Sequence, residues 1–145
     1  MKTARERFVS LFWCYFDPVQ SVLRYINAGH NSPILKRASG EIERLSTGGP
    51  PFGVPLFEDR EPAYALGTLR LVTGDLLFIF TDGVIEAVDD RRQEFGETRL
   101  VPILQSAPAE SAADTLRRVM TQVNTFVGYA RQHDDITCLV LRVIA

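Results

Sequence analysis

Residues 74–87 read GDLLFIFTDGVIEA, and this stretch places an acidic side chain directly after an apolar strand. Residues 76–80 are apolar without interruption, which indicates a strand that is covered on both faces and central in its sheet. The strand gives way to Asp82 and Gly83, and strand ends are where rigid scaffolds present functional groups. An Asp-Gly pair is also a common turn signal, so by itself the pair leaves an ordinary turn as the alternative.

The segment before residue 74 predicts antiparallel hairpins joined by turn residues. Its first strand is apolar at nearly every position, which is typical of a strand covered on both sides. The turn after that strand contains Asp17 and Pro18, and Asp17 can accept hydrogen bonds from the turn amides. Between the hairpins and the 74–87 stretch, residues 46–62 are rich in glycine, proline and charge and predict a loop. The strands expected here are residues 8–16, 22–28, 33–37, 42–45 and about 65–72.

The segment after residue 82 changes to helical periodicity. Residues 83–88 predict a short helical turn, and residues 97–105 predict a helix that tolerates Pro102 only near its start. Residues 111–129 carry apolar side chains at three- and four-residue steps, after a Ser-x-x-Asp start signal. A last strand is expected over residues 136–144. The order predicts an α+β fold in a single domain spanning residues 1–145, not alternating βαβ units.

Composition excludes several classes of function. The 145 residues are 46% apolar and 23% charged with a net charge of −2, which is ordinary for a globular protein and offers no basic block for nucleic acid. No apolar run reaches the length of a membrane span, and the charged start does not resemble a signal peptide. Cys14 and Cys138 each lie in an apolar run and are expected to be small buried side chains, so a reducing cytoplasm is the expected compartment.

Two further segments carry residues that suit chemistry. Asp134 and Asp135 stand before the last strand, where they could bind a hard cation such as Mg²⁺ or Mn²⁺, cap a helix, or only keep a loop in solvent. The loop at residues 27–33 contains Asn27, His30 and Asn31. His30 could be a base, a ligand or a residue that hydrogen-bonds within the loop, and the last reading is favoured.

Taken in order, five segments resemble one family. The chain is similar to the PPM-type (type 2C) serine/threonine protein phosphatases, in particular the bacterial SpoIIE/RsbU-like subgroup, from about Arg7 to the C-terminus. Several motifs in the same order are far more specific than any one of them. They are residues 27–31 (NAGHN), 48–53 (GGPPFG), 74–87, 94–97 (EFGE) and 132–137 (QHDDIT).

The resemblance implies a fold, a cofactor and a set of site residues. It implies part of an α-β-β-α sandwich of antiparallel sheets flanked by helices. It also implies two Mn²⁺ or Mg²⁺ ions in the complete enzyme, which activate a water for attack on phosphoserine or phosphothreonine, so no side chain acts as a nucleophile. By motif, Asp82 and Asp134 match metal ligands, and Asp135 and Gly83 match supporting or alternative ligands. Gly83 is also expected to allow a tight turn beside Asp82.

The sequence also departs from the family pattern. A Gly-Asp-Val-Ser-Gly-His-Gly-like motif, which supplies a bridging aspartate in the family, is not found here, and the first long helices of the domain are missing. The chain therefore matches the C-terminal portion of the catalytic domain. We expect it to have little or no phosphatase activity alone, because a hard-cation site weakens as ligand charge and count fall.

The resemblance implies a phosphorylated regulatory protein as substrate, of the type of an anti-sigma-factor antagonist, within bacterial sigma-factor or stress signalling. A non-catalytic pseudophosphatase or phosphoprotein-binding module is the alternative, and an unrelated α+β domain is the third. A partial sandwich exposes strand edges and apolar surface, so we also expect self-association through an exposed sheet edge.

Overall fold

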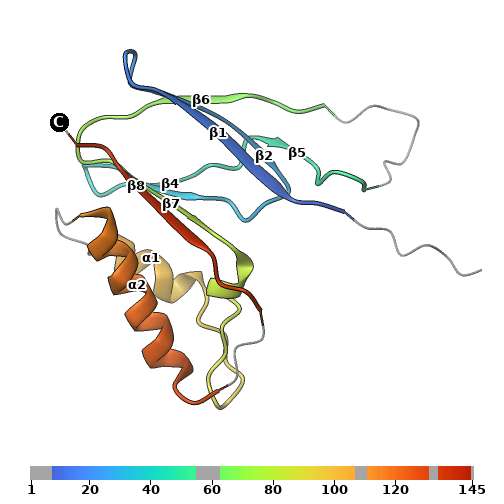
Figure 1. Cartoon of the computed structure of the whole chain (residues 1–145), viewed down its shortest axis with the longest axis vertical. Helices are drawn as coiled ribbons and strands as arrows, with labels where there is room; N and C mark the ends of the chain where they lie inside the picture. The colour runs from blue at the N-terminus through green and yellow to red at the C-terminus, as the bar shows by residue number, and fades with distance from the viewer. Residues whose placement is uncertain (1–7, 55–62, 107–110, 131–133, 145) are drawn as a thin grey trace, which may run out of the picture. The chain divides into compact units, whose positions relative to one another are not determined.

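The structure is a computed structural model that describes residues 8–54, 63–106, 111–130 and 134–144. The expected loop at 46–62 and the 132–137 motif therefore extend partly beyond the described residues. The elements in chain order are β1 (Leu11–Asp17), β2 (Val22–Ala28), β3 (Ile34–Lys36), β4 (Ile42–Arg44), β5 (Gly48–Gly49), β6 (Gly67–Arg70), β7 (Leu76–Phe80), the 3-10 helix η1 (Asp82–Val84), α1 (Glu97–Gln105), α2 (Ala112–Val127) and β8 (Cys138–Arg142) (Figure 1). The α+β class with antiparallel sheets and two helices is confirmed.

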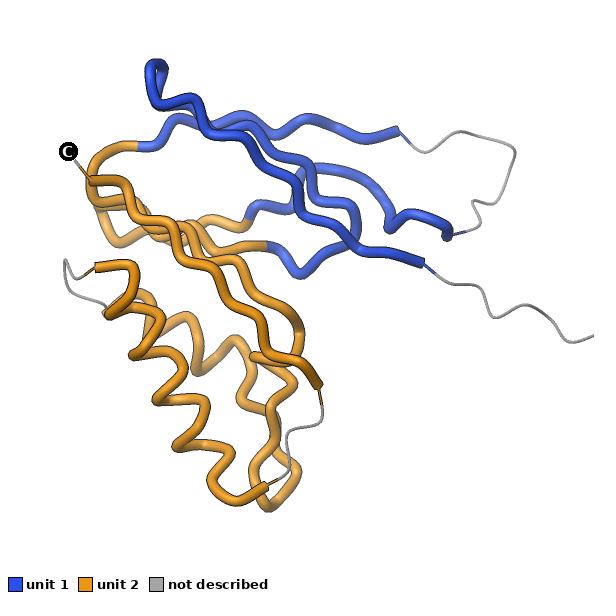
Figure 2. The backbone as a smooth tube through the Cα atoms, in the orientation of Figure 1, with its two compact units in different colours: residues 1–32, 45–71 blue, residues 33–44, 72–145 orange. Residues whose placement is uncertain are grey.

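The chain divides into two compact units, coloured separately in Figure 2. Unit 1 comprises residues 1–32 and 45–71, and unit 2 comprises residues 33–44 and 72–145. The two units alternate along the sequence, so each unit is built from two separate segments of the chain. The expectation of a single domain is not tested by this division and stays a prediction.

The sheet of unit 1 is built around β2. β1 pairs with it antiparallel from Leu11↔Ala28 to Asp17↔Val22, and the Asp17 carboxylate accepts hydrogen bonds from the turn amides of Val19 (2.9 Å) and Gln20 (3.0 Å) as expected. β6 pairs antiparallel with β2, whereas β5 adds a short parallel pairing.

The first strand is less covered than its sequence predicts. Leu11, Trp13 and Tyr15 project to one face of β1 and remain about half exposed (45%, 49% and 53%), so the prediction that both faces are covered is wrong. Cys14 is exposed as well, which corrects its expected burial. The apolar run correctly predicts a strand, but such a run does not show whether another part of the protein covers each face of the strand.

Unit 2 carries a four-stranded antiparallel sheet in the order β4-β3-β7-β8, so β7 is an interior strand as its unbroken apolar run predicts. α1 and α2 lie on one face of this sheet (Figure 1). Cys138 on β8 packs against the resulting core, where burial raises the pKa of its thiol to about 11. The fully buried members of the core come from β3, β7, η1, both helices and the segment just before α1, which supplies Phe95. They are Ile34, Leu76, Phe78, Phe80, Val84, Phe95, Leu100, Leu104, Val119 and Val123.

The helices follow the sequence closely. α1 has the expected bounds, and α2 begins after Ser111, whose side-chain oxygen accepts a hydrogen bond from the Asp114 amide (3.1 Å) as the start signal predicts. Pro102 differs from expectation, because it lies inside α1 rather than near its start. A proline there removes one backbone hydrogen bond to the preceding turn, yet the helix continues to Gln105 because its apolar face is anchored by Leu100 and Leu104.

Among the described residues, neither α1 nor α2 combines the length and the apolar character that a membrane-spanning helix requires.

Candidate metal centre

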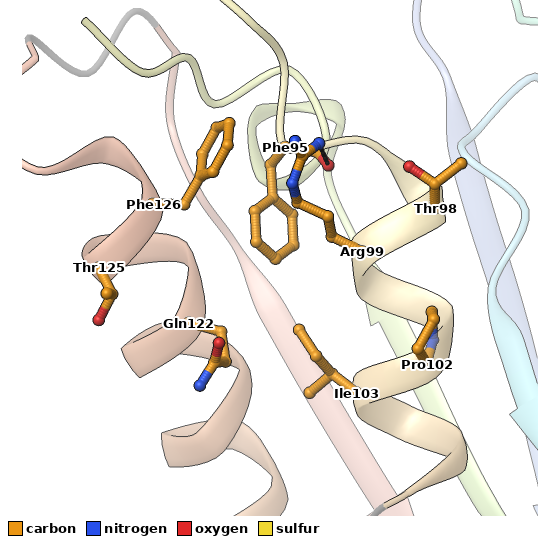
Figure 3. Close-up of a pocket in the computed structure, with 8 residues that line it drawn as sticks. All are labelled: Phe95, Thr98, Arg99, Pro102, Ile103, Gln122, Thr125 and Phe126. Carbon is orange, nitrogen blue, oxygen red and sulfur yellow. Dashed lines mark hydrogen bonds between the residues drawn. The ribbon is translucent and has the colours of Figure 1, made fainter.

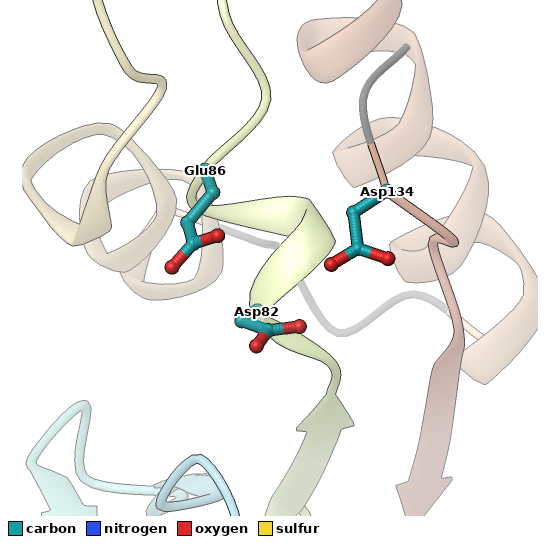
Figure 4. Close-up of side chains that lie close together, drawn as sticks. All are labelled: Asp82, Glu86 and Asp134. Atoms are coloured by element: carbon teal, nitrogen blue, oxygen red, sulfur yellow. The ribbon is translucent and has the colours of Figure 1, made fainter. Parts of the chain in front are cut away.

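The ends of β7 and β8 bring the two predicted aspartates together. β7 runs antiparallel to β8 and their last pair is Phe80↔Cys138, so the end of β7 and the start of β8 share one edge of the sheet. Asp82 lies just after β7 and Asp134 just before β8. In the described residues, these two side chains and Glu86 form a group in which one carboxylate oxygen from each residue lies within 4.8 Å of the other two. Figure 4 shows the three carboxylates converging.

Glu86 joins the group through a single helical turn. The backbone amides of Ile85 and Glu86 both donate to the Asp82 carbonyl at 2.9 Å. A spacing of four residues in such a turn puts both side chains on the same side. Glu86 was not among the predicted site residues, although it lies in the 74–87 stretch. The signal that would have found it is its four-residue distance from Asp82.

Backbone amides orient the two aspartate carboxylates. The amide of Gly83 donates to Asp82 Oδ1 at 3.0 Å, and the amide of Asp135 donates to Asp134 Oδ1 at 2.7 Å. Asp82, Glu86 and Asp134 are all exposed, so an ion from solvent can reach them. The structure thus orients the carboxylates before any ion is bound, and the assignment of Asp82 and Asp134 as metal ligands stays a prediction.

Asp135 and Gly83 contribute through their backbones. The Asp135 side chain does not belong to the three-carboxylate group found among the described residues. Its carbonyl lies so close to Gly83 that a Cβ added to the glycine would sit 2.6 Å from that oxygen. Gly83 does not have a positive φ. Gly83 does lie in the tight turn that was expected there, but the turn itself does not require a glycine. The close approach of the 134–135 backbone does.

The loop at residues 27–31 is held by its own hydrogen bonds in unit 1. Asn27 is buried, its Nδ2 donates to the Leu45 carbonyl (3.1 Å) and its Oδ1 accepts from the His30 amide (2.8 Å). His30 Nδ1 lies 2.8 Å from the Asn31 carbonyl oxygen. These contacts support the loop-shaping interpretation, because the polar atoms of Asn27 are used to connect backbone segments.

A groove of about 430 Å³ lies between α1 and α2 (Figure 3). Its lining, as far as the described residues go, has one ionisable side chain, Arg99. The other lining residues are Phe95, Thr98, Pro102, Ile103, Gln122, Thr125 and Phe126. The guanidinium of Arg99 packs 4.6 Å from the centre of the Phe126 ring, and its Nη1 donates to the carbonyls of Glu94 and Phe95. Arg99 therefore joins the two helices, and the acidic cluster remains the site that suits chemistry.

The donor set of the cluster suits a hard divalent cation. Mg²⁺ and Mn²⁺ prefer carboxylate oxygens, and opposite ligands of Mg²⁺ lie about 4.2 Å apart while adjacent ones lie about 3.0 Å apart. Three oxygens within 4.8 Å need side-chain adjustments of only about an ångström or two to meet at one ion. Without a cation the three carboxylates repel one another, which gives ion binding a direct electrostatic gain.

Comparison with solved structures defines the class of the fold. The SiaA-PP2C domain of Pseudomonas aeruginosa matches 92% of this chain at 18% identity with a TM-score of 0.79, and 51% of that chain is covered. The catalytic domain of the phosphatase PstP, solved with two manganese ions, matches 94% of this chain at 17% identity with a TM-score of 0.61, and 59% of it is covered. The fold is therefore that of part of a PP2C phosphatase domain.

The family follows from the sequence. Residues 1–144 match the family described as Stage II sporulation protein E (SpoIIE), and the chain belongs to that family. Protein IcfG of Synechocystis sp. is 28% identical over 134 residues, which are 92% of this chain and 20% of IcfG. The chain thus spans about half the length of the structural relatives and a fifth of IcfG. The family resemblance expected from the ordered motifs is confirmed.

Proposed function

We propose that the chain is the C-terminal half of a catalytic domain that hydrolyses phosphoserine and phosphothreonine on a regulatory protein in bacterial signalling. The family match and the PP2C fold support a phosphatase. The substrate is proposed to be a small phosphorylated regulator, of the type that controls sigma factors. The observation that carries the proposal is the convergence of Asp82, Glu86 and Asp134 at one sheet edge.

The three carboxylates would hold a Mn²⁺ or Mg²⁺ ion. Such an ion, when bound, supplies a water activated for attack and neutralises charge on the phosphoryl group. The role of this chain is to position the ligands: β7 and β8 fix the backbone at positions 82 and 134, and the amides of Gly83 and Asp135 orient the two aspartates. Because the site is exposed, a phosphorylated side chain on another protein can reach it.

The acidic cluster argues against a phosphate-binding module without metal. A phosphate group carries about two negative charges at neutral pH. Three carboxylates within 4.8 Å of one another would repel it unless a cation lay between them. A phosphoprotein-binding function of this site therefore requires a metal just as catalysis does. The family match and the PP2C fold make the hydrolase the better-supported proposal.

Replacing Asp134 with asparagine tests the proposed metal site. We expect the wild-type chain to bind Mn²⁺ saturably, measured by electron paramagnetic resonance of the free ion. Asp134→Asn should weaken this binding at least about tenfold, because affinity for hard cations follows the charge of the ligands. Asp135→Asn is the matched control, since it removes a neighbouring charge outside the three-carboxylate group and should change the affinity less than about threefold.

Two outcomes would contradict this assignment. Absence of saturable Mn²⁺ binding by the wild-type chain would overturn the metal site. A larger loss of affinity for Asp135→Asn than for Asp134→Asn would move the ligand role to Asp135. Turnover of p-nitrophenyl phosphate by this chain alone is expected to be negligible, since PstP holds two manganese ions whereas the described residues of this chain offer one acidic group. Clear Mn²⁺-dependent turnover would show that one acidic group is enough.

We also propose that the chain self-associates through β1. From Phe12 to Asp17 this strand pairs only with β2 among the described residues, and its exposed face carries Leu11, Trp13 and Tyr15. An open strand with apolar side chains and no charge between residues 8 and 16 lacks the features that natural edge strands use against pairing.

Sedimentation velocity measures this association. The weight-average sedimentation coefficient of the wild-type chain should rise with concentration. Trp13→Lys should weaken the association at least about tenfold, because it replaces a large apolar contact with a charge. Val19→Lys is the control, since Val19 is an exposed apolar residue of the β1–β2 turn and not of the β1 face. A wild-type chain that stays monomeric at high concentration would disprove the proposal.

A further inference from the structure

Thr81 connects the two segments that carry the acidic cluster. Its hydroxyl donates to the Asp135 carbonyl at 3.0 Å and accepts from the Thr137 amide at 3.0 Å. Its backbone amide also donates to the Thr137 carbonyl at 3.0 Å. One residue therefore makes three hydrogen bonds to the segment that follows Asp134, and it directly precedes Asp82 in the chain.

These bonds lie beyond the regular β7–β8 ladder. The ladder pairs residues 76–80 with residues 138–142, and residues 134–137 are not part of a strand. The register of the sheet is thus set without the Thr81 side chain. What the hydroxyl adds is a fixed position for the Asp135 carbonyl, one residue after Asp134. A threonine or serine hydroxyl can donate and accept at the same time over this short reach.

We propose that Thr81 is a positioning residue for the metal site, whose hydroxyl sets the spacing between the Asp82 and Asp134 carboxylates. The Asp135 carbonyl is held by the Thr81 hydroxyl and packs closely against Gly83, so contacts from both sides of Asp82 fix it. This inference rests on the proposed metal-binding function. It concerns the distance between two exposed carboxylates that would bind the same ion, because metal ligands must be held close to the positions that the ion requires.

Two substitutions separate positioning from simple stabilisation. Thr81→Val has nearly the same shape as threonine but removes both hydroxyl hydrogen bonds, whereas Thr81→Ser retains the hydroxyl. We expect Thr81→Val to weaken Mn²⁺ binding at least about tenfold, the range found when residues that support metal ligands are lost. Thr81→Ser should restore the affinity to within about twofold of wild type. If Thr81→Val lowers the urea midpoint but leaves the Mn²⁺ affinity of the folded chain unchanged, the proposal is overturned.

A measurement without metal distinguishes a failure of this inference from a failure of the proposed function. Asp82→Cys and Asp134→Cys are introduced together in a chain with Cys14→Ser and Cys138→Ser, and disulfide formation under a mild oxidant is timed by gel. Adding Thr81→Val should slow this cross-linking at least about fivefold, and Thr81→Ser should not. An equal rate with and without Thr81→Val would overturn the positioning role. Should the wild-type chain bind no Mn²⁺ while the cross-linking still depends on the hydroxyl, the metal function fails and the positioning role stands.

Discussion

Gly83→Ala is expected to destabilise the chain by about 2 kcal/mol, the cost typical of overpacking a tight contact, and to weaken Mn²⁺ binding at least about tenfold. The added Cβ would lie 2.6 Å from the Asp135 carbonyl oxygen and 3.1 Å from its carbonyl carbon. Both are backbone atoms, so the clash is relieved only by moving the 134–135 segment away from η1. That movement separates Asp134 from Asp82 and Glu86.

The sign of this effect is informative because backbone conformation alone predicts the opposite. Gly83 does not have a positive φ, and replacing glycine with alanine in a compatible conformation stabilises a protein by about 0.4–1 kcal/mol. Urea unfolding followed by circular dichroism, together with Mn²⁺ titration, measures both consequences. A variant that is as stable as wild type and binds Mn²⁺ equally well would contradict this prediction. It would show that the 134–135 segment can move away from the added Cβ without loss of stability or of Mn²⁺ affinity.

Gly40→Ala is the control for this substitution. Gly40 has φ of +92°, and a Cβ added there meets no atom within 4 Å. Its replacement should cost about 1–2 kcal/mol of backbone strain without any steric clash. We expect its Mn²⁺ affinity to equal that of wild type, because Gly40 lies in the β3–β4 turn and not in the metal site.

Asp75→Ala is expected to cost about 4 kcal/mol of unfolding free energy, the range for breaking a buried ion pair. The Asp75 side chain is fully buried, at 0% exposure. Its Oδ2 accepts from Arg37 Nη1 (3.0 Å) and the Val72 amide (3.1 Å), and its Oδ1 accepts from the Ala38 amide (2.8 Å). The hydrogen bonds that Arg37 donates to Glu43 and to Asp75 raise the pKa of its guanidinium above the ordinary value. Because an arginine stays protonated even without a partner, Asp75→Ala leaves its positive charge without the buried carboxylate.

Glu43→Ala is the matched control, because Glu43 pairs with the same guanidinium from a partly exposed position. A pair of that kind contributes about 0–1 kcal/mol, so this variant should unfold close to wild type. Asp75→Asn keeps one acceptor oxygen but loses the charge, so its loss of unfolding free energy should lie between those of Asp75→Ala and Glu43→Ala. The unfolding free energies come from urea titration at neutral pH. Equal costs for Asp75→Ala and Glu43→Ala would show that burial does not strengthen the Asp75 contacts.

Strands and helices were predictable from the sequence where a local pattern of side chains is enough to define them. β7 is continuous in apolar side chains, and its bounds match the prediction, as do those of β2 and α1. The Ser111 start of α2 follows from a side chain that hydrogen-bonds three residues ahead, which is a purely local event. The exposed face of β1 was not predictable. A nearly continuous apolar run identifies a strand, but what covers each face depends on residues distant in the sequence.

The candidate metal site was also predictable only in part. The sequence predicts Asp82 and Asp134 as cation ligands, because both lie at strand ends within motifs that follow the family order. That these two residues, distant in sequence, meet at one end of the sheet, and that Glu86 joins them, follows from the three-dimensional fold. The physical reason is that an antiparallel pairing fixes which chain ends meet, whereas ligand geometry depends on distances of a few ångströms that no local pattern encodes.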